Sequence, residues 1–288
     1  MFAAHMDEVG FLVRNISDIG FLILTPLGGV LDKAKENQIV RVTNEEGQKF
    51  EGLLNVTKNS KGEIEQMYVD LGLETRAEVE TRGIDIGDMV CFASTFKSLV
   101  ADDTFAGKAM DDRVGCFALI EAMKALSTLD IAVNIVAAFT SSEEVGTRGG
   151  KTSSTRIKPD LFFAVDVANH PELDRSYLNS RKLGQGPMIV HYDKTMVPNR
   201  QLLKEVKGIF ESHRIPYQKD MLKGGGTDAA LAHLEKSGTP AMVIGIPLRY
   251  CHGPYSFVNM NDAKHASLAI EQIAKNFNSD LINQIYKF

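Results

Sequence analysis

From about Phe105 to the end of the chain, apolar runs of strand length alternate with segments of helical pattern, and this alternation constrains the fold most strongly. The runs IAVNIVAAFT, PDLFFAVDVA and TPAMVIGIP are almost continuously apolar. Such runs are typical of parallel strands that are covered by helices on both faces. The stretch MFAAHMD at the start of the chain has the same character. We therefore predict an α/β domain whose first strand is this N-terminal stretch.

The segments between these runs carry apolar residues at helical spacing. In DDRVGCFALIEAMKALSTL, the residues that share one predicted apolar face are Val114, Phe117, Ile120, Met123 and Leu126. The segment NDAKHASLAIEQIAKNF is predicted to form a closing helix, with Asn261 or Asp262 as its N-cap. Helices of this kind connect parallel strands, which supports the α/β prediction.

Residues 11 to about 105 follow a different pattern. Short apolar stretches such as FLILTPL, QIVRV and EQMYVDLG are separated by the turn-prone pieces SDIG, NEEGQ and KNSKGE. This rhythm predicts a small β-rich barrel or sandwich. We predict that it is an insertion, so that residues 1–12 and 106–288 form the α/β domain and residues 13–105 form the β-rich domain.

Acidic or imidazole side chains stand at the ends of nearly all the predicted α/β strands. Their positions are His5, Asp7, Glu143, Glu144, Asp166 and His252, together with Asp111 and Asp112 just before a predicted helix. Alone, each has a structural explanation: an acidic pair is usually a solvated loop or a helix N-cap, and a single histidine is usually a hydrogen-bonded core residue. Because sites in open α/β sheets form at the carboxyl ends of strands, the recurrence predicts one convergent site.

The adjacent pair Glu143 and Glu144 distinguishes two kinds of chemistry. The two acids of a glycosidase must flank one bond, with their carboxyl groups roughly 5 to 9 Å apart. Neighbouring residues that leave a strand point in different directions, which suits a different division of labour: one glutamate binds a metal ion and the other is a general base. The pattern therefore predicts a metallohydrolase in which metal-activated water attacks a carbonyl.

Composition excludes several partners. The net charge is -5 and no basic block is present, so nucleic acid is not an expected partner. No apolar run approaches the roughly 20 residues of a membrane span, so no membrane is expected. Cys91, Cys116 and Cys251 lack Cys-x-x-Cys spacing, so neither a disulfide framework nor a thiolate zinc site is expected. This usage is typical of a reducing cytosol, and we predict a cytoplasmic protein.

Six motifs, taken in order, resemble those of the glutamyl aminopeptidase family of dinuclear metallopeptidases, also called deblocking or tetrahedral aminopeptidases. The motifs are AHMDEVGFLV, GKAMDDRVGC, SSEEVGTRGG, AVDV, GGGTDAALAH and IPLRYCHGPYSFV. The resemblance implies a mixed-sheet α/β/α metallopeptidase domain with an inserted β-rich, barrel-like dimerisation domain. It also implies hydrolysis of the N-terminal residue from short peptides, and a homo-oligomer that ranges from a dimer to a dodecamer.

The resemblance further implies a metal ligand set. Asp111 would bridge two divalent ions, with His5 and Asp166 completing one ion and Glu144 and His252 completing the other. Ligands of imidazole and carboxylate type suit zinc or cobalt better than calcium or magnesium.

Two other acidic residues would complete the chemistry by the same resemblance. Glu143 would be the general base, which takes a proton from the attacking water and passes it to the leaving amine. Asp7 would orient the ring of His5. Family members typically also have a cis peptide bond between Asp111 and Asp112.

The loop KGGGTDAA would line the substrate pocket through Gly225, Gly226, Thr227 and Asp228, although it can equally be a turn capped by Thr227 or Asp228. If the preferred substrates begin with Glu or Asp, the pocket needs a cation. Arg249 is the candidate nearest in sequence to a predicted ligand. An arginine at this position can also simply brace acidic ligands, so both alternatives stay open.

Two other functions stay open at this stage: an amidohydrolase that acts on acyl-amino acids, and a catalytically weak, truncated paralogue that serves as a binding or assembly subunit. The second arises because family members usually carry a further segment before the His-x-Asp motif. Without that segment, the strand that carries His5 is expected to become a sheet edge or to fray. The chain is then expected to bind the ion at His5 more weakly than the other ion, and to be poorly active or aggregation-prone.

Overall fold

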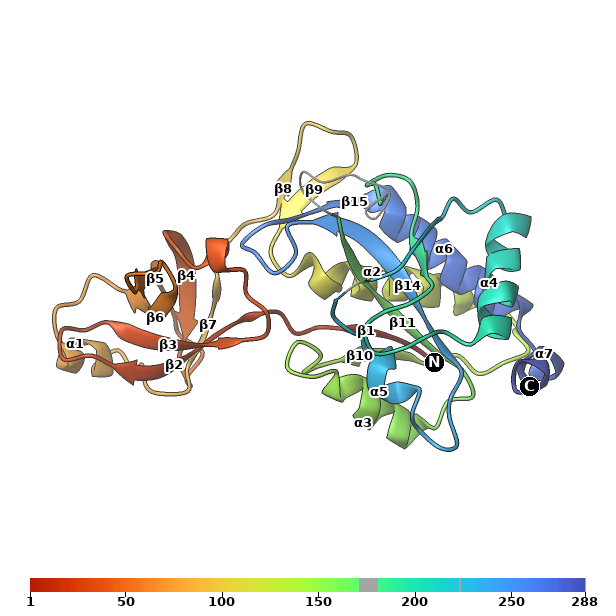
Figure 1. The fold of residues 1–288 in the computed structure, drawn as a ribbon, viewed down its shortest axis with the longest axis horizontal. Helices are drawn as coiled ribbons and strands as arrows, with labels where there is room; N and C mark the ends of the chain where they lie inside the picture. The colour runs from red at the N-terminus through yellow and green to blue at the C-terminus, as the bar shows by residue number, and fades with distance from the viewer. Residues whose placement is uncertain (171–180, 223, 288) are drawn as a thin grey trace.

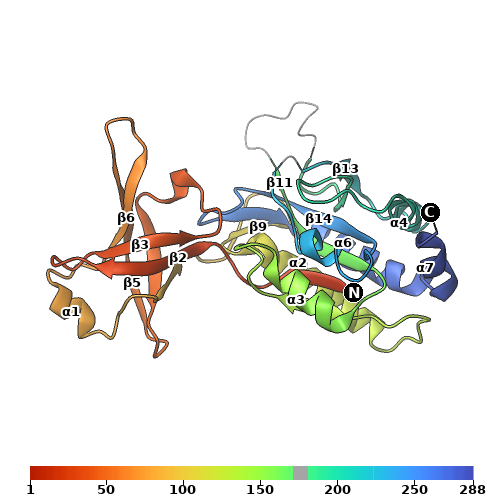
Figure 2. The same ribbon diagram turned by 60° about the horizontal axis from the view of Figure 1, so that its bottom comes forward.

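The structure is a computed structural model, and it describes residues 1–170, 181–222 and 224–287. Two bodies lie side by side along the longest axis of the molecule (Figures 1 and 2). One is a mixed β-sheet with helices on both faces, and the other is a closed β-barrel. The predicted fold class is therefore confirmed.

In the described part of the chain, nine strands form the mixed sheet. They are β1 (Phe2–His5), β8 (Lys97–Ser98), β9 (Thr104–Gly107), β10 (Ala137–Thr140), β11 (Phe162–His170), β12 (Met188–Val190), β13 (Gln218–Asp220), β14 (Ala241–Arg249) and β15 (Ser256–Asn259). Strands β10, β1, β11 and β14 are neighbours in this order and run parallel. Strands β15, β9 and β8 continue the sheet in antiparallel pairs. β12 pairs antiparallel with β14 and parallel with β13.

Helices cover both faces of this sheet. They are α2 (Met110–Leu126), α3 (Arg148–Ile157), α4 (Arg200–Ser212), α5 (Ala229–Ala232), α6 (Met260–Asn276) and α7 (Ser279–Ile285). Helices α2, α4 and α6 pack on one face, and α3 and α5 pack on the other. None of the helices in the described ranges has the length and apolar character needed to cross a membrane.

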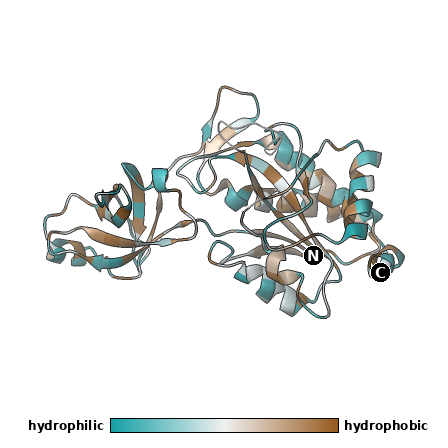
Figure 3. Cartoon of the chain, viewed as in Figure 1, coloured by the Kyte–Doolittle hydropathy of each residue, from teal (hydrophilic) through white to brown (hydrophobic). Residues whose placement is uncertain are grey.

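The strands explain the apolar runs in the sequence. Along β11, Phe163 and Val165 belong to the core on one face of the sheet, whereas Phe162 and Ala164 belong to the core on the other face. Because both faces are buried, every position of the strand is apolar until the site is reached. Figure 3 shows this as hydrophobic colour along the central strands, whereas the helices carry a mixture of hydrophilic and hydrophobic colours.

The barrel closes in the order β2-β3-β6-β5-β4-β7. Its strands are β2 (Gly10–Ile16), β3 (Leu22–Leu27), β4 (Gln38–Thr43), β5 (Lys49–Lys58), β6 (Ile64–Asp70) and β7 (Met89–Phe92), with the short helices η1 (Asp32–Ala34) and α1 (Arg76–Glu80) between them. Phe11, Leu54 and Phe92 are buried in its core. The domain boundaries at residues 12 and 105, and the dimerisation role of the barrel, stay predictions.

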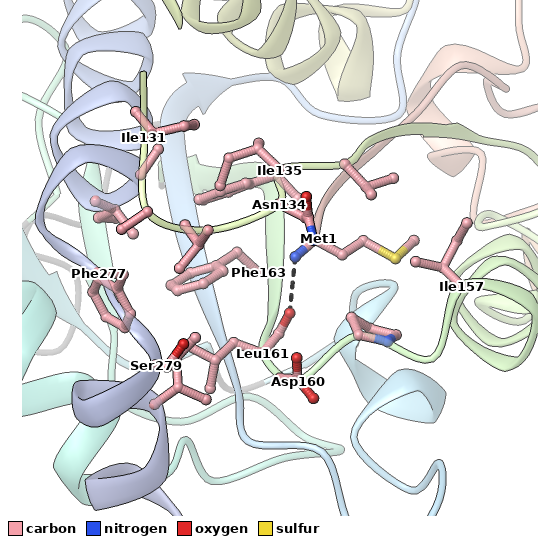
Figure 4. Close-up of a pocket in the computed structure, with 18 of the residues that line it drawn as sticks. Met1, Ile131, Asn134, Ile135, Ile157, Asp160, Leu161, Phe163, Phe277 and Ser279 are labelled. Atoms are coloured by element: carbon pink, nitrogen blue, oxygen red, sulfur yellow. Dashed lines mark hydrogen bonds between the residues drawn. The ribbon is translucent and has the colours of Figure 1, made fainter. Parts of the chain in front are cut away.

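Strand β1 lies inside the mixed sheet, between β10 and β11, and is buried along its whole length. Met1 is buried too, and its amino group donates a hydrogen bond to the Leu161 carbonyl at 2.9 Å (Figure 4). Burial lowers the pKa of this amino group to about 5. Beside it lies a cavity of about 470 Å³ with Phe163 and Phe277 on its wall. The expectation that this strand becomes an edge or frays is wrong, because β10 pairs along its outer side.

The run IAVNIVAAFT differs from its prediction. Its strand, β10, spans only Ala137–Thr140, and it stands at the end of the sheet order. Phe139 is 39% exposed, and residues 131–136 line the cavity shown in Figure 4. The run is therefore not a strand covered on both faces. The physical reason is its outermost position, where β1 is its pairing partner among the described strands.

The buried face of α2 also differs from its prediction. Ile120 is 44% exposed, and the buried face includes Ala118, Leu119 and Ala122. The helix packs on β1 and β11, and the small side chains of Ala118 and Ala122 allow this close approach. The buried face of α2 therefore does not include Ile120.

Helix α6 is capped by Asn259, not by Asn261 or Asp262. The Asn259 side chain accepts a hydrogen bond from the Asn261 backbone N–H at 3.0 Å. Asp262 is fully buried instead, and its carboxylate accepts hydrogen bonds from the backbone N–H groups of Gly184 and Gly186, each at 2.7 Å. Burial raises the pKa of Asp262 to about 6. Asp262 thus ties the segment before β12 to the helix.

Candidate metal centre

The carboxyl ends of the parallel strands lie together along one end of the mixed sheet, beside a cavity of about 730 Å³. β1 ends in His5, the loop after β10 carries the two glutamates, and the turn after β14 carries His252. The predicted ligand and base residues that line the cavity are Asp111, Glu143, Glu144, Asp166 and His252. His5 lies against them and is 2% exposed. The structure therefore brings the predicted residues together.

Asp111 stands at the centre of this group. Asp111 and Asp112 have non-helical backbone angles inside α2, and the peptide bond between them is cis, as the resemblance implies. Oδ1 of Asp111 is 3.1 Å from Nε2 of His5, and Oδ2 of Asp111 is 3.1 Å from Nε2 of His252. The two oxygens of one carboxylate therefore face two different histidines, which is the arrangement that a bridging ligand needs.

Asp112 holds this segment against β1. Its buried carboxylate accepts hydrogen bonds from the backbone N–H groups of His5 and Gly115, both at 3.2 Å. A Cβ atom on Gly115 would lie 2.4 Å from Oδ1 of Asp112, so the close approach of the carboxylate requires glycine.

Two sets of donor atoms flank Asp111. On one side, donor atoms of His5, Asp112 and Asp166 lie within 4.8 Å of one another, and Oε2 of Glu143 is 3.8 Å from Nε2 of His5. On the other side, Nε2 of His252 is 3.4 Å from Oε2 of Glu144. A Glu144 oxygen also lies within 4.8 Å of donor atoms of His5 and Asp111, so Glu144 stands between the two histidines, whereas Glu143 lies beside His5.

Asp7 links the glutamate loop to His5. Its carboxylate accepts hydrogen bonds from the backbone N–H of Glu143 at 3.3 Å and of Glu144 at 3.2 Å. Oδ1 of Asp7 also lies 3.5 Å from Nδ1 of His5, and the carbonyl oxygen of Asp7 lies 3.2 Å from the same nitrogen. One residue therefore fixes both the loop and the histidine ring, as expected for a residue that orients a metal ligand.

Burial and close packing of charged groups shift the pKa values of the site residues. Burial and neighbouring carboxylates raise the pKa of Glu143 to about 9, of Glu144 to about 7 and of Asp166 to about 8. Burial by itself would lower the pKa of His5, but its hydrogen bonds with Asp111 and Asp7 raise the pKa above the usual range. Carboxylates crowded in this way need positive charge to be stable in their ionised form.

Glu144 shows that a cation fits here. Its side chain is 7% exposed, and its Oε1 atom has no hydrogen-bond partner in the part of the chain that the structure describes. An unpaired buried carboxylate oxygen is costly, and a metal ion would satisfy it. Imidazole and carboxylate donors together are ligands of divalent transition metals. The residues present therefore fit a metal centre.

The predicted substrate residues divide into two groups. Gly225, Gly226 and Thr227 line the cavity. Asp228 is 2% exposed, and its carboxylate accepts hydrogen bonds from the Gly150 backbone N–H at 2.8 Å and from the Thr140 hydroxyl. Because these partners stand at the two ends of the loop that carries the glutamates, Asp228 braces that loop.

The structure places a different arginine beside the cavity from the one that the sequence singled out. Arg249 ends β14 and is not among the described residues that line the cavity. Arg181 does line the cavity, is 8% exposed, and has its Nε 2.9 Å from Oδ2 of Asp220. Nothing in the sequence connects Arg181 with a strand end, so no signal could have found it.

Sequence reasoning also missed contacts around His252. With Nε2 facing Asp111, Nδ1 of His252 lies 3.0 Å from the Gly29 carbonyl oxygen, which accepts its hydrogen. The backbone N–H of Leu31 donates to the His252 carbonyl at 3.3 Å. Cys251 Sγ lies 2.8 Å from Oδ2 of Asp111. The position of Cys251 next to a predicted ligand was the available signal.

Comparison with known proteins gives concordant matches. Residues 1–268 match the family model described as M42 glutamyl aminopeptidase. The glutamyl aminopeptidase of Lactococcus lactis subsp. cremoris is 30% identical, in an alignment that covers 100% of this chain and 83% of that protein.

Solved structures match as well. Aminopeptidase APDkam598 of the archaeon Desulfurococcus kamchatkensis superposes with a TM-score of 0.94 at 33% identity, covering 100% of this chain and 82% of that one. The TET1 peptidase of Pyrococcus horikoshii, which can assemble into a tetrahedron or a large octahedral shell, superposes with a TM-score of 0.86 at 29% identity. That match covers 96% of this chain and 83% of the other.

Proposed function

Because this chain belongs to the M42 glutamyl aminopeptidase family, it is a metallo-aminopeptidase, and we propose that it cleaves the N-terminal residue from short peptides at a centre of two divalent ions. The observation that carries the proposal is the geometry of Asp111, whose two oxygens face His5 and His252. His5, Asp111 and Asp166 would hold one ion. Asp111, Glu144 and His252 would hold the other. Zinc or cobalt is the metal that this donor set favours.

The chain supplies the proton transfers. When bound, the two ions supply Lewis acidity toward the peptide carbonyl and lower the pKa of a water molecule. Glu143 accepts the proton of the attacking water and passes it to the leaving amine. The position of Glu143 supports this role, because its carboxylate lines the cavity beside His5 while Asp7 holds its backbone N–H.

Hydrolysis of amino-acid p-nitroanilides tests the proposal. The full chain is treated with a chelator and then reloaded with zinc or cobalt. We expect activity to be lost on chelation and restored by metal, whereas N-acetylated analogues stay uncut because they lack a free α-amine. Preferential cleavage of the acylated substrates would favour an amidohydrolase. Metal binding without hydrolysis of either substrate would favour a catalytically weak paralogue.

We extend the proposal to substrates with an N-terminal Glu or Asp, with Arg181 as the cation that reads the acidic side chain. Its place on the cavity wall supports this role better than that of Arg249. The test compares kcat/KM for Glu and Leu p-nitroanilides in the wild type, in Arg181→Met and in the control Arg249→Met. We expect Arg181→Met alone to lower the Glu-to-Leu ratio. Equal kcat/KM for Glu and Leu in the wild type would contradict acid specificity.

Homo-oligomeric assembly is a further part of the proposal. The shells formed by the Pyrococcus horikoshii relative support it. The barrel also carries an exposed apolar pair, because Ile39 (53% exposed) and Leu53 (38% exposed) lie directly opposite each other on β4 and β5. Light scattering of the wild type is expected to show a dimer or a larger particle. In Ile39→Asp, the measured mass of this oligomer should be smaller. A stable wild-type monomer at micromolar concentration would contradict this part.

A cytosolic location stays a prediction. It is supported by the state of Cys91, Cys116 and Cys251, which are free thiols in the structure.

A further inference from the structure

We propose that Cys251 is an additional ligand of the metal centre: its sulfur binds, as a thiolate, the ion held by Asp111, Glu144 and His252. This inference rests on the proposed function, because it adds a donor to one of the two proposed ions. It makes those two ions chemically different. The ion beside His5 would have only nitrogen and oxygen donors from the residues assigned to it, whereas the ion beside His252 would also have sulfur.

The first support is the spacing of the donor atoms. Sγ of Cys251 is 2.8 Å from Oδ2 of Asp111, and Nε2 of His252 is 3.1 Å from the same oxygen. Donor atoms of Asp111, Cys251 and His252 all lie within 4.8 Å of one another. Tetrahedral zinc with bonds of about 2.0 to 2.3 Å keeps its donors roughly 3.3 to 3.8 Å apart. A small movement of the Cys251 sulfur away from Oδ2 of Asp111 would therefore bring the two atoms to the separation expected for two ligands of one ion.

The second support is the unpaired oxygen of Glu144 in the same half of the site. Oε2 of Glu144 faces His252, but Oε1 is buried and has no hydrogen-bond partner among the described residues. This unsatisfied carboxylate oxygen independently indicates that a cation belongs in the site that Glu144 shares with Asp111 and His252. Both Glu144 and Cys251 line the same cavity.

The turn after β14 directs two consecutive side chains toward Asp111. In an extended chain, neighbouring side chains point to opposite sides. Here Tyr250 and His252 have positive φ angles of 61° and 62°, so the chain folds back around Cys251. As a result, both Cys251 and His252 contact the same oxygen of Asp111.

The bonding change can be stated atom by atom. In the structure, the Cys251 thiol donates its hydrogen to Oδ2 of Asp111. On metal binding, the S–H bond breaks, the proton leaves to solvent, and the sulfur lone pair forms the bond to the ion. Because thiolate is a soft ligand, the His252 side should then prefer zinc, cobalt or cadmium over manganese or magnesium.

Cys116 provides the matched control. It is also buried beside the centre, but its Sγ donates to the backbone carbonyl of His5 at 3.3 Å and does not face a ligand atom. The variant Cys116→Ser therefore tests the loss of a nearby thiol without the loss of a proposed ligand.

X-ray absorption spectroscopy of the zinc-loaded wild-type protein tests the inference directly. We expect a sulfur shell at about 2.3 Å from zinc, which does not depend on any variant folding correctly. The cobalt-loaded protein should show near-ultraviolet thiolate-to-cobalt charge-transfer absorption. Both signals should be lost in Cys251→Ser and retained in Cys116→Ser. Zinc affinity on the His252 side should fall by at least about tenfold in Cys251→Ser, with a smaller loss for manganese.

The opposite results separate the inference from the proposed function. If the wild type binds two ions whose shells contain only nitrogen and oxygen, Cys251 is a hydrogen-bond donor to Asp111 and the inference is overturned. If the wild type binds neither zinc nor cobalt, the dinuclear centre itself is refuted, and the inference fails with it.

Discussion

The carboxylate of Asp7 accepts a hydrogen bond from the backbone N–H of Glu143 at 3.3 Å. The same carboxylate holds the N–H of Glu144 and lies beside the ring of His5. In Asp7→Asn, one of these acceptor positions becomes an amide donor. We expect metal affinity and kcat each to fall by about 10- to 100-fold while the fold is retained. Metal titration and steady-state kinetics measure this, and Asp18→Asn on the barrel surface is the control. Unchanged values in Asp7→Asn would contradict the positioning role.

Glu143→Gln should separate catalysis from metal binding. Because Glu143 is proposed as the base and not as a ligand, the variant should keep both ions and lose about 10²- to 10⁴-fold in kcat. Glu144→Gln is the matched comparison and should lose metal on the His252 side. Metal analysis with kinetics decides the pair. If Glu143→Gln loses metal while Glu144→Gln keeps it, the two roles are inverted.

Asp111→Ala should remove both ions, because each histidine faces one of its two carboxylate oxygens. Asp166→Ala should weaken only the ion beside His5. The ratio of metal to protein, measured by elemental analysis after dialysis, distinguishes the two variants. Retention of one tightly bound ion in Asp111→Ala would show that Asp111 is not a bridge.

Two glycine-to-alanine changes in helices should act in opposite directions. A Cβ atom on Gly150 in α3 would lie 2.4 Å from the Asp228 carbonyl oxygen, so Gly150→Ala should displace Asp228 and lower both the melting temperature and kcat. A Cβ atom on Gly208 in α4 meets nothing within 4 Å among the described residues. Gly208→Ala should therefore stabilise the protein by about 0.5 to 1 kcal/mol. Equal melting temperatures for the two variants would argue against the brace.

Asp262 gives a pH dependence of stability. Burial raises its pKa to about 6, above the value of 3.8 expected in the unfolded chain. The folded state therefore holds this proton more tightly, and the stability that it contributes is present below pH 4 and is lost as pH rises through 6. Between pH 4 and 7, the wild type should lose about 2 to 3 kcal/mol relative to Asp262→Asn. Chemical denaturation of both proteins at each pH measures this difference, and a constant difference would contradict it.

The sheet and the site were predictable from the sequence wherever the local pattern of apolar residues corresponds to burial in the folded protein. β11 and β14 are buried on both faces, so their apolar runs identify them without ambiguity. Parallel strands bring their carboxyl ends to one edge, which is why His5 and His252 could be placed together from strand ends alone.

Other features depend on which surface a neighbour covers or on the path of a loop. Ile120 has the right helical spacing, but periodicity cannot show which side of α2 the sheet contacts. Phe139 belongs to an apolar run, but the run cannot show that its strand is outermost. Arg181 and Gly29 reach the cavity through loops. The spacing of the cysteines predicts no metal site at Cys251, because spacing in sequence does not show proximity to carboxylates and histidine.

The centre is assembled from distant parts of the chain, since His5 and Asp111 are 106 residues apart and Asp111 and Cys251 are 140 residues apart. The barrel, by contrast, is built from one continuous stretch between β1 and β9. During synthesis, the barrel can therefore fold while the strands that complete the centre have yet to leave the ribosome. The centre as a whole forms only after translation has passed residue 252, so the proposed ions can bind their complete ligand set only after His252 has been synthesised.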